Sequence, residues 1–486
     1  MESSRACHLG RVPLPFLDID PTFVMIVDHA ATPKGCPIVT HQESARPQGQ
    51  RWSASEPTRL VADDCGPAVL TAGASRRPDS LRVARHQPDP YYWVENFNLD
   101  SDYLEWRVDS DEAAHFEATL LVSTAEDTAF TLTNLTTGRA VAAISHGYGW
   151  DRLTLGSLLL PQGTSTLRLT RNATSTADVP VKSLELLPTA TREEYLRRVR
   201  AAKVDSQWLT DARYGLFFQY GGWSYPPTGE RKSIEDQCRD FDVERFVAMV
   251  LASGAGYVMW SYTWASFEVQ GPNPVIDRIL GHGDNTSRID LILTLARALK
   301  TQGIRFLLYY HNGHDEDPAW WEKQCFPAGY RETGVGDKSI FERNWMKIIS
   351  WIGEHFGELL DGFWFDDGAY YYPTDFERLL TAARTGNPQR IVSYNSWVGP
   401  TLTSFQDYRS GEDYDGGVEG GTVVGPDGVY LTGRTAASAG MPTTCSTRTG
   451  ACMSRTRRSC WCAARSRSSA TSPRLRSPGR RCRSRR

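Results

Sequence analysis

Five short runs of consecutive apolar residues recur between positions 215 and 395, and a stretch with helical periodicity separates each run from the next. Runs of this length, without polar alternation, predict strands that are buried on both faces. Alternating βα units of this size predict a parallel sheet, most simply a (β/α)8 barrel of the TIM type. The runs are GLFFQYG (215–221), YVMWSY (257–262), RFLLYYH (305–311), GFWFDD (362–367) and RIVSYN (390–395), and the helical patterns lie near 240–252, 288–302, 341–356 and 374–385.

The barrel predicted for residues 208–433 is incomplete at its C-terminal end. A full barrel of this type needs eight strands. The sequence supplies five clear ones and a sixth near 408–412. The remaining two would fall where the composition of the chain changes abruptly, near residue 433.

The preceding region has a different periodicity and predicts a β-sandwich over residues 81–190. Short alternating runs follow one another there without intervening helices, which is typical of two packed antiparallel sheets. Residues 1–80 are rich in Pro, Ser and Arg and predict an irregular segment, and the charged stretch 191–207 predicts a helical linker. The alternating runs cover 102–108, 115–123, 128–135, 139–147, 151–160, 165–172 and 181–187.

The C-terminal segment 434–486 stands apart in composition. It contains 14 Arg and no acidic residue, so the rest of the chain carries 40 basic against 57 acidic residues and the formal net charge of -3 is a misleading average. Dense Arg is typical of an arm that binds nucleic acid. The accompanying Ser, Cys, Pro and Ala indicate instead GC-rich codons read in a wrong frame, or a disordered tail. We therefore expect no nucleic-acid partner.

Several classes of protein and site are not expected. No stretch reaches the ~18 to 20 apolar residues of a membrane span, and the start MESSRACHLG lacks the pattern of a signal peptide. The compartment is left open, including secretion or a periplasmic location if the N-terminus is incomplete. No glycine-rich phosphate loop follows a strand, and neither the ten scattered cysteines nor the two histidines of YYHNGH (309–314) form a convincing metal site. We expect no cofactor and no metal, and the oligomeric state is left open.

Carboxylates flanked by aromatic residues follow the fourth apolar run, in WFDDGAYYY (364–372). In a barrel of this kind, functional side chains lie at the carboxyl ends of the strands. Aromatic rings stack on sugars and paired acids cleave glycosidic bonds, so Asp366 and Asp367 predict a carbohydrate site. For Asp367, a cap on the following helix is an equally good interpretation. The acidic segment 407–419 offers a second carboxylate, although a solvated loop is the simpler reading of any one acid there.

Several segments together resemble the α-L-fucosidases of glycoside hydrolase family 29 over about residues 205–420. RYGLFFQYGGWS (213–224) resembles the first-strand segment RFGMFIHWGLYS of that family, and GAGYVMW (254–260) and GIRFLLYYHN (303–312) resemble its second and third strands. GFWFDDGAYY resembles the fourth-strand segment that carries the nucleophile. SYNSW (393–397) resembles its NDRW stretch, and DYRSGE (407–412) resembles a segment whose Glu is the acid/base in some members.

The resemblance implies a retaining exo-glycosidase that acts on terminal sugars of glycans. It assigns Asp366 as the nucleophile and Glu412 as the acid/base, whose carboxyl groups should lie ~5 to 5.5 Å apart for retention. Where the family has His-Trp, this chain has Gln219 and Tyr220. The paired histidines of the family fall at Thr263 and Trp264, and the Arg of NDRW falls at Ser396. The expected substrate contacts are Gln219, Tyr220, Trp260, Trp264, Tyr310, His311, Trp364, Asp367 and Asn395.

The N-terminal sandwich resembles carbohydrate-binding modules of families 6 and 35, chiefly in WDRLTLGSLLLPQGTSTLRLTRN (150–172). This resemblance leaves calcium in the sandwich open. Two alternatives to catalysis also remain. The chain could be a carbohydrate-binding protein without activity, because the family's histidines are replaced, or an inactive product whose barrel cannot close.

Overall fold

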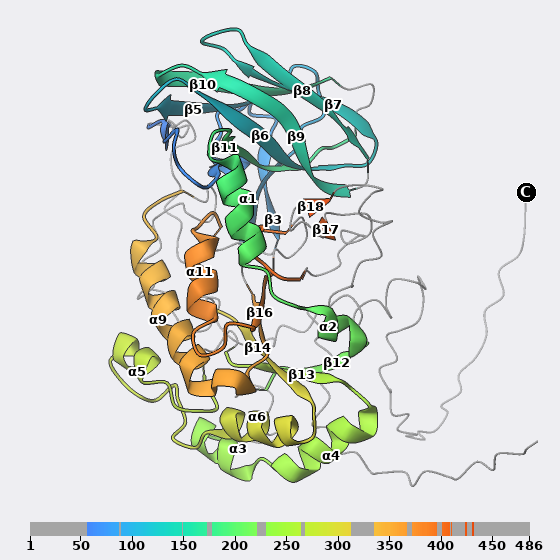
Figure 1. The fold of residues 1–486 in the computed structure, drawn as a ribbon, viewed down its shortest axis with the longest axis vertical. Coiled ribbons are helices and arrows are strands. Elements are labelled where there is room, and N and C mark those ends of the chain that lie inside the picture. The colour runs from blue at the N-terminus through green and yellow to red at the C-terminus, as the bar shows by residue number, and fades with distance from the viewer. Residues whose placement is uncertain are drawn as a thin grey trace, which may run out of the picture.

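The computed structural model describes most of the chain between residues 56 and 431. The described ranges are 56–86, 89–147, 149–172, 177–220, 230–263, 268–312, 335–366, 372–395, 401–408, 410, 423–424 and 430–431. Residues 1–55 of the irregular segment predicted for 1–80, and the tail 434–486, lie outside them. Within these ranges the chain is a multidomain β plus α/β fold, with a sandwich at one end of the long axis and a parallel sheet with its helices at the other (Figure 1).

Two sheets pack face to face in the N-terminal region. The first has the order β1-β5-β10-β7-β8, with β1 (Thr58–Leu60), β5 (Leu104–Ser110), β10 (Gly163–Asn172), β7 (Asp127–Asn134) and β8 (Ala140–His146). The second has the order β3-β4-β11-β6-β9, with β2 also paired to β11. Its strands are β2 (Ala68–Thr71), β3 (Arg82–His86), β4 (Asp89–Glu95), β11 (Val181–Pro188), β6 (Ala114–Thr124) and β9 (Gly149–Leu160).

Alternation along the strands decides which side chains fill the sandwich. In β7, Phe130 and Leu132 are fully buried while Thr131 between them is half-buried. Leu167 and Leu169 of β10 alternate in the same way and join the same core. Because β1 and β2 pair with β5 and β11, the sandwich begins earlier in the chain than residue 81. A short 3-10 turn, Ala72–Ala74, follows β2.

The linker contains a helix, α1 (Arg192–Ala201), which lies between the two regions in Figure 1. A second short helix, α2 (Gln207–Asp211), precedes the parallel sheet. Leu196 and Val199 are the buried residues of α1, and its other side chains are mostly charged. This distribution explains why the stretch is charged in sequence and yet helical.

The C-terminal region is a sheet of five parallel strands in chain order. They are β12 (Gly215–Phe218), β13 (Tyr257–Ser261), β14 (Arg305–Tyr310), β15 (Gly362–Phe365) and β16 (Ile391–Tyr394). The connections contain α3 (Ile234–Asp240), α4 (Val243–Ser253), α5 (Pro274–Leu280), α6 (Leu291–Thr301), α9 (Ser339–Phe356), the 3-10 turn Gly357–Leu359 and α11 (Phe376–Ala383). Side chains of Asp242, Asn273, Asp290 and Asp375 cap helix N-termini by accepting backbone N–H groups.

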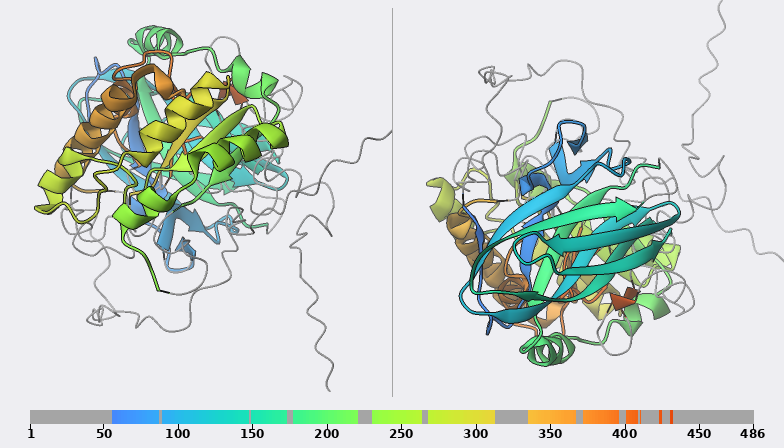
Figure 2. Two further views of the ribbon diagram at one scale, coloured as in Figure 1. Left: turned by 90° about the horizontal axis from the view of Figure 1, so that it is seen from below. Right: turned by 90° about the horizontal axis from the view of Figure 1, so that it is seen from above.

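The long helices pack against one face of this sheet (Figure 2). The core on that face joins side chains of all five strands to α4, α6, α9 and α11. The opposite face packs against α2 through Leu209 and Trp208. Long helices on a single face are what a barrel wall has, whereas a doubly wound sheet has long helices on both faces. The eight-stranded barrel stays a prediction, because the described residues contain five of its strands.

Most of the expected sixth strand, near 408–412, lies outside the described residues, which include only Tyr408 and Ser410 of it. The segment just before it lies along the edge of β16, where the Asp407 N–H donates to the Val392 carbonyl at 2.8 Å. The Asp407 carboxylate in turn accepts the Val392 N–H and is paired with Arg384, both bonds at 2.7 to 2.8 Å. Further on, β17 (Val423–Val424) pairs with β18 (Tyr430–Leu431) as a separate antiparallel ladder.

Arg390, just before β16, ties the ends of two helices to the sheet. It is fully buried, and its guanidinium donates to five backbone carbonyls. Orphan carbonyls at helix C-termini need such partners when they are buried. Burial lowers the pKa of Arg390 to about 10. The carbonyls belong to Gly353, Gly357, Leu360, Ala383 and Thr385.

Within the described part of the chain, no helix is both long enough and apolar enough to cross a membrane.

Candidate active site

Asp366 is the first residue beyond β15, at the carboxyl edge of the parallel sheet. Its N–H donates to the Tyr310 carbonyl at 2.9 Å, which fixes the backbone where the strand ends. The side chain is 7% exposed, so the carboxylate is held within the protein rather than in bulk water. A buried carboxylate requires hydrogen-bond donors around it.

Two neutral donors meet the Asp366 carboxylate. The Tyr309 hydroxyl donates to Oδ2, and the Asn395 amide donates to Oδ1 at 2.7 Å. The Asn395 backbone N–H donates to Phe365 at 2.7 Å, which places this amide beside Asp366. The donors come from β14 and from the end of β16, the two neighbours of β15 in the sheet. The arrangement orients the carboxylate.

Aromatic rings line the same face of the sheet below the carboxylate. Trp364 stacks on Phe217 with 6.1 Å between ring centroids, and Phe217 lies 5.1 Å from Tyr309. The rings of Tyr309 and His311 are stacked at 6.3 Å. The indole nitrogen of Trp364 is buried and donates to no described group. Such rings can stack on the apolar face of a sugar while a carboxylate acts on its polar edge.

His311 and Gln219 lie at the ends of their strands on this face. The His311 side chain is 4% exposed, and its backbone N–H donates to the Thr263 hydroxyl at 3.0 Å. Gln219 is buried, and its Oε1 accepts no hydrogen bond from a described group. Because alternate residues of a strand share a face, Gln219 follows Phe217 onto the side that carries Trp364. Both positions supply polar groups that a bound polyol could use.

Three of the predicted substrate contacts lie elsewhere, in the core between the sheet and the helices. Trp260 is 1% exposed, packs against Phe246 and donates from its indole to Gln270 at 3.2 Å. Tyr310 is equally buried, and burial raises its pKa well above the ordinary value. Tyr220 packs on Trp260 at 5.4 Å. These three side chains face away from Asp366 and are left out of the site proposed below.

Three other predicted site residues lie outside the described residues. These are Glu412, Asp367 and Trp264. The separation between Asp366 and Glu412 therefore stays a prediction. The structure adds Tyr309, which the sequence places in the YYHN cluster without distinguishing it from Tyr310. The signal that separates them is the period of two, because Tyr309 shares its face with His311 and Tyr310 does not.

Among the described residues, no three or more His, Cys, Asp and Glu side chains come together in a way that could hold a metal ion.

No family model and no curated protein matches the sequence. Parts of the chain are similar to solved glycoside hydrolases. A Podospora anserina β-(1,4)-mannanase with family 26 and carbohydrate-binding family 35 parts shows 14% identity and a TM-score of 0.22, over 68% of this chain and 86% of that one. An endo-fucoidan hydrolase of family 107 shows 17% identity and a TM-score of 0.32, over 42% of this chain and 44% of the other.

A third structure, an isomalto-dextranase of Arthrobacter globiformis in complex with panose, shows 14% identity and a TM-score of 0.22, and covers 25% of this chain and 23% of that chain. Scores this low assign neither a fold nor an activity. The interpretation of the site therefore depends on its own geometry.

Proposed function

We propose that this chain is a retaining glycosidase that acts on terminal sugars and is similar to α-L-fucosidases. The observation that carries the proposal is the Asp366 carboxylate, buried at the carboxyl end of a parallel strand and oriented by Tyr309 and Asn395. Trp364 supplies an aromatic surface on the same face of the sheet. A fixed carboxylate beside aromatic rings is suited to attack on a sugar.

In the proposed reaction, one oxygen of Asp366 attacks the anomeric carbon while the bond to the leaving oxygen breaks. Glu412 gives its proton to that leaving oxygen, so a neutral alcohol departs and a glycosyl ester forms on Asp366. Glu412, now a carboxylate, then takes a proton from water as the water oxygen attacks the anomeric carbon. The ester bond breaks, the Asp366 carboxylate returns, and the sugar leaves with its anomeric configuration retained.

Tyr309 and Asn395 act as positioning residues in this scheme. Each donates one hydrogen bond to a different oxygen of Asp366, so the carboxylate cannot rotate freely before the attack. When the ester forms, the charge on the carboxylate disappears and the donors lose part of their interaction. They should therefore hold the nucleophile in place rather than increase its reactivity.

The identity of the sugar is the finer part of the proposal. Gln219 stands where the α-L-fucosidases have a histidine, and Thr263 and Trp264 stand where they have a pair. The Thr263 hydroxyl is bonded to the His311 backbone, so the hydroxyl groups of the substrate would meet the Gln219 amide instead of histidines. We propose L-fucose as the first sugar to test, followed by other aryl glycosides. If another sugar is hydrolysed instead of L-fucose, Asp366 remains the proposed nucleophile and only the proposed sugar specificity changes.

The test is Asp366→Asn, which keeps the size of the side chain and the donors around it. Hydrolysis of the best aryl glycoside should fall by about 10³-fold or more, because the amide cannot form the ester. Asp284→Asn is the matched control, since Asp284 is exposed and lies away from the sheet edge. Turnover that survives Asp366→Asn would remove the proposed nucleophile.

A carbohydrate-binding protein without hydrolysis is the second candidate, favoured by the replaced histidines. It predicts saturable glycan binding with no product from any aryl glycoside. Release of a sugar at a rate that Glu412→Gln abolishes would eliminate this candidate.

A further inference from the structure

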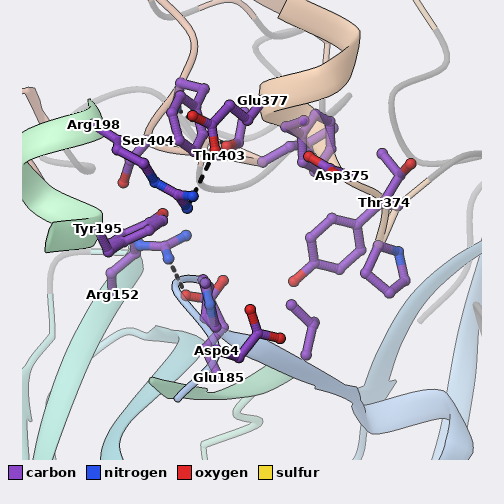
Figure 3. A pocket seen from close by; sticks show the side chains of 18 residues that line it. Asp64, Arg152, Glu185, Tyr195, Arg198, Thr374, Asp375, Glu377, Thr403 and Ser404 are labelled. Carbon is purple, nitrogen blue, oxygen red and sulfur yellow. Dashed lines mark hydrogen bonds and ion pairs between the residues drawn. The ribbon is translucent and has the colours of Figure 1, made fainter. Parts of the chain in front are cut away.

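A cavity of about 470 Å³ lies between the sandwich, the linker helix and the parallel sheet region (Figure 3). The sandwich contributes Asp64, Arg152 and Glu185, and α1 contributes Tyr195 and Arg198. The remaining wall comes from the segment that leads into α11 and from residues 402–405. In Figure 3 the polar ends of Arg152, Glu185 and Asp64 surround the same space as Arg198 and Asp375. Three separate parts of the chain therefore form one site.

This cavity is distinct from the site at Asp366. Its wall includes Tyr372 and Phe376, and Phe376 packs on Tyr394 with 4.9 Å between ring centroids. Tyr394 belongs to the core on the helix side of the parallel sheet. Trp364 lies on the opposite face of the sheet, away from the helices, and Asp366 shares that face because it is two residues further along. A ligand in the cavity would thus be separated from the proposed nucleophile by the sheet.

Two ion pairs lie in the cavity wall. Arg152 pairs with Glu185, with side-chain exposures of 11% and 8%, and burial raises the pKa of Glu185. Arg198 pairs with Glu377 at 3.2 Å. Each guanidinium is already matched by a carboxylate, so neither is a free charge for an anionic ligand. Buried pairs cost desolvation energy and are kept where hydrogen bonds use their remaining groups.

The rest of the wall is polar and carries two further carboxylates, Asp64 and Asp375, beyond the two ion pairs. Asp375 accepts the N–H of Arg378 at 3.1 Å as the cap of α11, and Thr374, Thr403 and Ser404 also line the space. Tyr195 offers a ring, which packs edge-on against Phe405 at 5.9 Å. Hydroxyl groups of a ligand can donate to the carboxylates and accept from the guanidinium groups at once. A cation would interact with the carboxylates only, and an anion with the guanidinium groups only.

We infer that this cavity is a second binding site, for a hydroxyl-rich molecule of monosaccharide size. The volume lies within the range of small-molecule sites, about 300 to 1,000 Å³. Because its walls come from both regions of the chain, an occupied site would also hold the sandwich against the parallel sheet region. This inference does not depend on hydrolysis at Asp366.

The experiment measures binding by titration calorimetry on the full chain carrying Asp366→Asn, so that turnover does not interfere. The probes are L-fucose, D-galactose, D-mannose and D-glucose, with putrescine and inorganic sulfate as charged comparisons. Val69→Phe places a ring in the cavity from β2, and Glu377→Gln removes one charge with little change in volume. Glu194→Gln is the matched control, because Glu194 pairs with Arg197 on the exposed side of α1.

At least one sugar should bind saturably. Val69→Phe should weaken that binding by about tenfold or more, Glu377→Gln by a smaller factor, and Glu194→Gln not at all. Urea unfolding of each variant shows whether it is folded, and if Val69→Phe is not, Glu377→Gln decides alone. The inference is overturned if no sugar binds, if only putrescine or sulfate binds, or if sugar binding is the same in folded cavity variants as in the control. Sugar binding that follows the cavity variants supports it even if no substrate is ever hydrolysed.

Discussion

The two faces of the parallel sheet are built from the same apolar runs and yet differ in what they end in. On the helix side, Trp260, Tyr310 and Phe365 continue into a closed core. On the other side, Tyr309 lies next to a buried carboxylate, Asp366. Tyr309 and Tyr310, neighbours in sequence, therefore lie on opposite faces, one beside Asp366 and the other in the core. The helix face is a closed hydrophobic core, whereas the other face combines a smaller buried cluster with the Asp366 carboxylate that we propose as the nucleophile.

This division can be broken by a change on the helix face. Trp260→Ala removes a ring that packs on Phe218, Tyr220, Phe241 and Phe246. The free energy of unfolding should fall by about 3 to 5 kcal/mol, since the cavity left behind adds to the lost burial. Urea denaturation measures the change. A loss of activity in protein that remains fully folded and equally stable would contradict the division.

Arg390→Met should lower the free energy of unfolding by the next largest amount. Five carbonyls lose their donor, and buried carbonyls without partners are costly, so we expect a loss of about 3 kcal/mol in the free energy of unfolding. Arg378→Met, on the exposed side of α11, is the control. Equal stability of the two variants would show that Arg390 does not hold the helix ends.

Tyr309→Phe tests the other face. It removes one hydroxyl from Asp366 and keeps the ring between Phe217 and Trp364. We expect kcat to fall by about 10²-fold, a barrier increase of about 2.7 kcal/mol, with little change in KM. Tyr310→Phe is the matched comparison, because the Tyr310 side chain lies on the helix side. Loss of the Tyr310 hydroxyl should therefore leave kcat nearly unchanged. Equal effects of the two variants would erase the distinction between the faces.

The sandwich contains a buried lysine, Lys182, that belongs to neither of the two proposed sites. Lys182 of β11 lies under the rings of Trp93 and Tyr372, and its Nζ donates to no described group. Burial lowers its pKa from 10.5 to about 7. Between these two values the unfolded chain binds the proton and the folded chain does not, so the free energy of unfolding rises with pH.

Lys182→Met should remove part of that rise. From pH 7 to pH 8, the free energy of unfolding should rise by about 1 kcal/mol more in the parent than in the variant. One protonation difference contributes at most about 1.4 kcal/mol per pH unit. Comparison with the parent is needed because burial also lowers the pKa of Lys338 to about 7. Lys347→Met, at an exposed position of α9, is the control. Identical pH slopes for Lys182→Met and the parent would place the lysine in contact with water or with a counter-charge.

The order of elements could be predicted because the two periodicities differ so clearly. Alternating runs gave the sandwich strands, such as β7, and continuous runs gave β12 to β16. The face on which each side chain lies could not be taken from a continuous run, since both neighbours in Tyr309-Tyr310 are aromatic and buried. Counting residues in twos back from His311 would have separated them, because Tyr309 shares its face with His311.

Long-range contacts were also beyond the sequence. Nothing local indicates that Asn395 reaches Asp366, 29 residues earlier, because that contact depends on β15 and β16 being neighbours. The cavity lined by Glu185 and Glu377 likewise requires two separate regions of the chain to meet. The early strands β1 and β2 were missed because they are short and lie in a Pro- and Ser-rich segment.

The central claim is that Asp366 forms a covalent bond to the sugar, and trapping tests it most directly. The protein is incubated with a 2-deoxy-2-fluoro glycosyl fluoride of its best substrate, digested and examined by mass spectrometry. The account predicts one added glycosyl group, on the peptide that contains Asp366, and none in Asp366→Asn. An adduct on a different carboxylate, or hydrolysis that inverts the anomeric centre without any adduct, would contradict it.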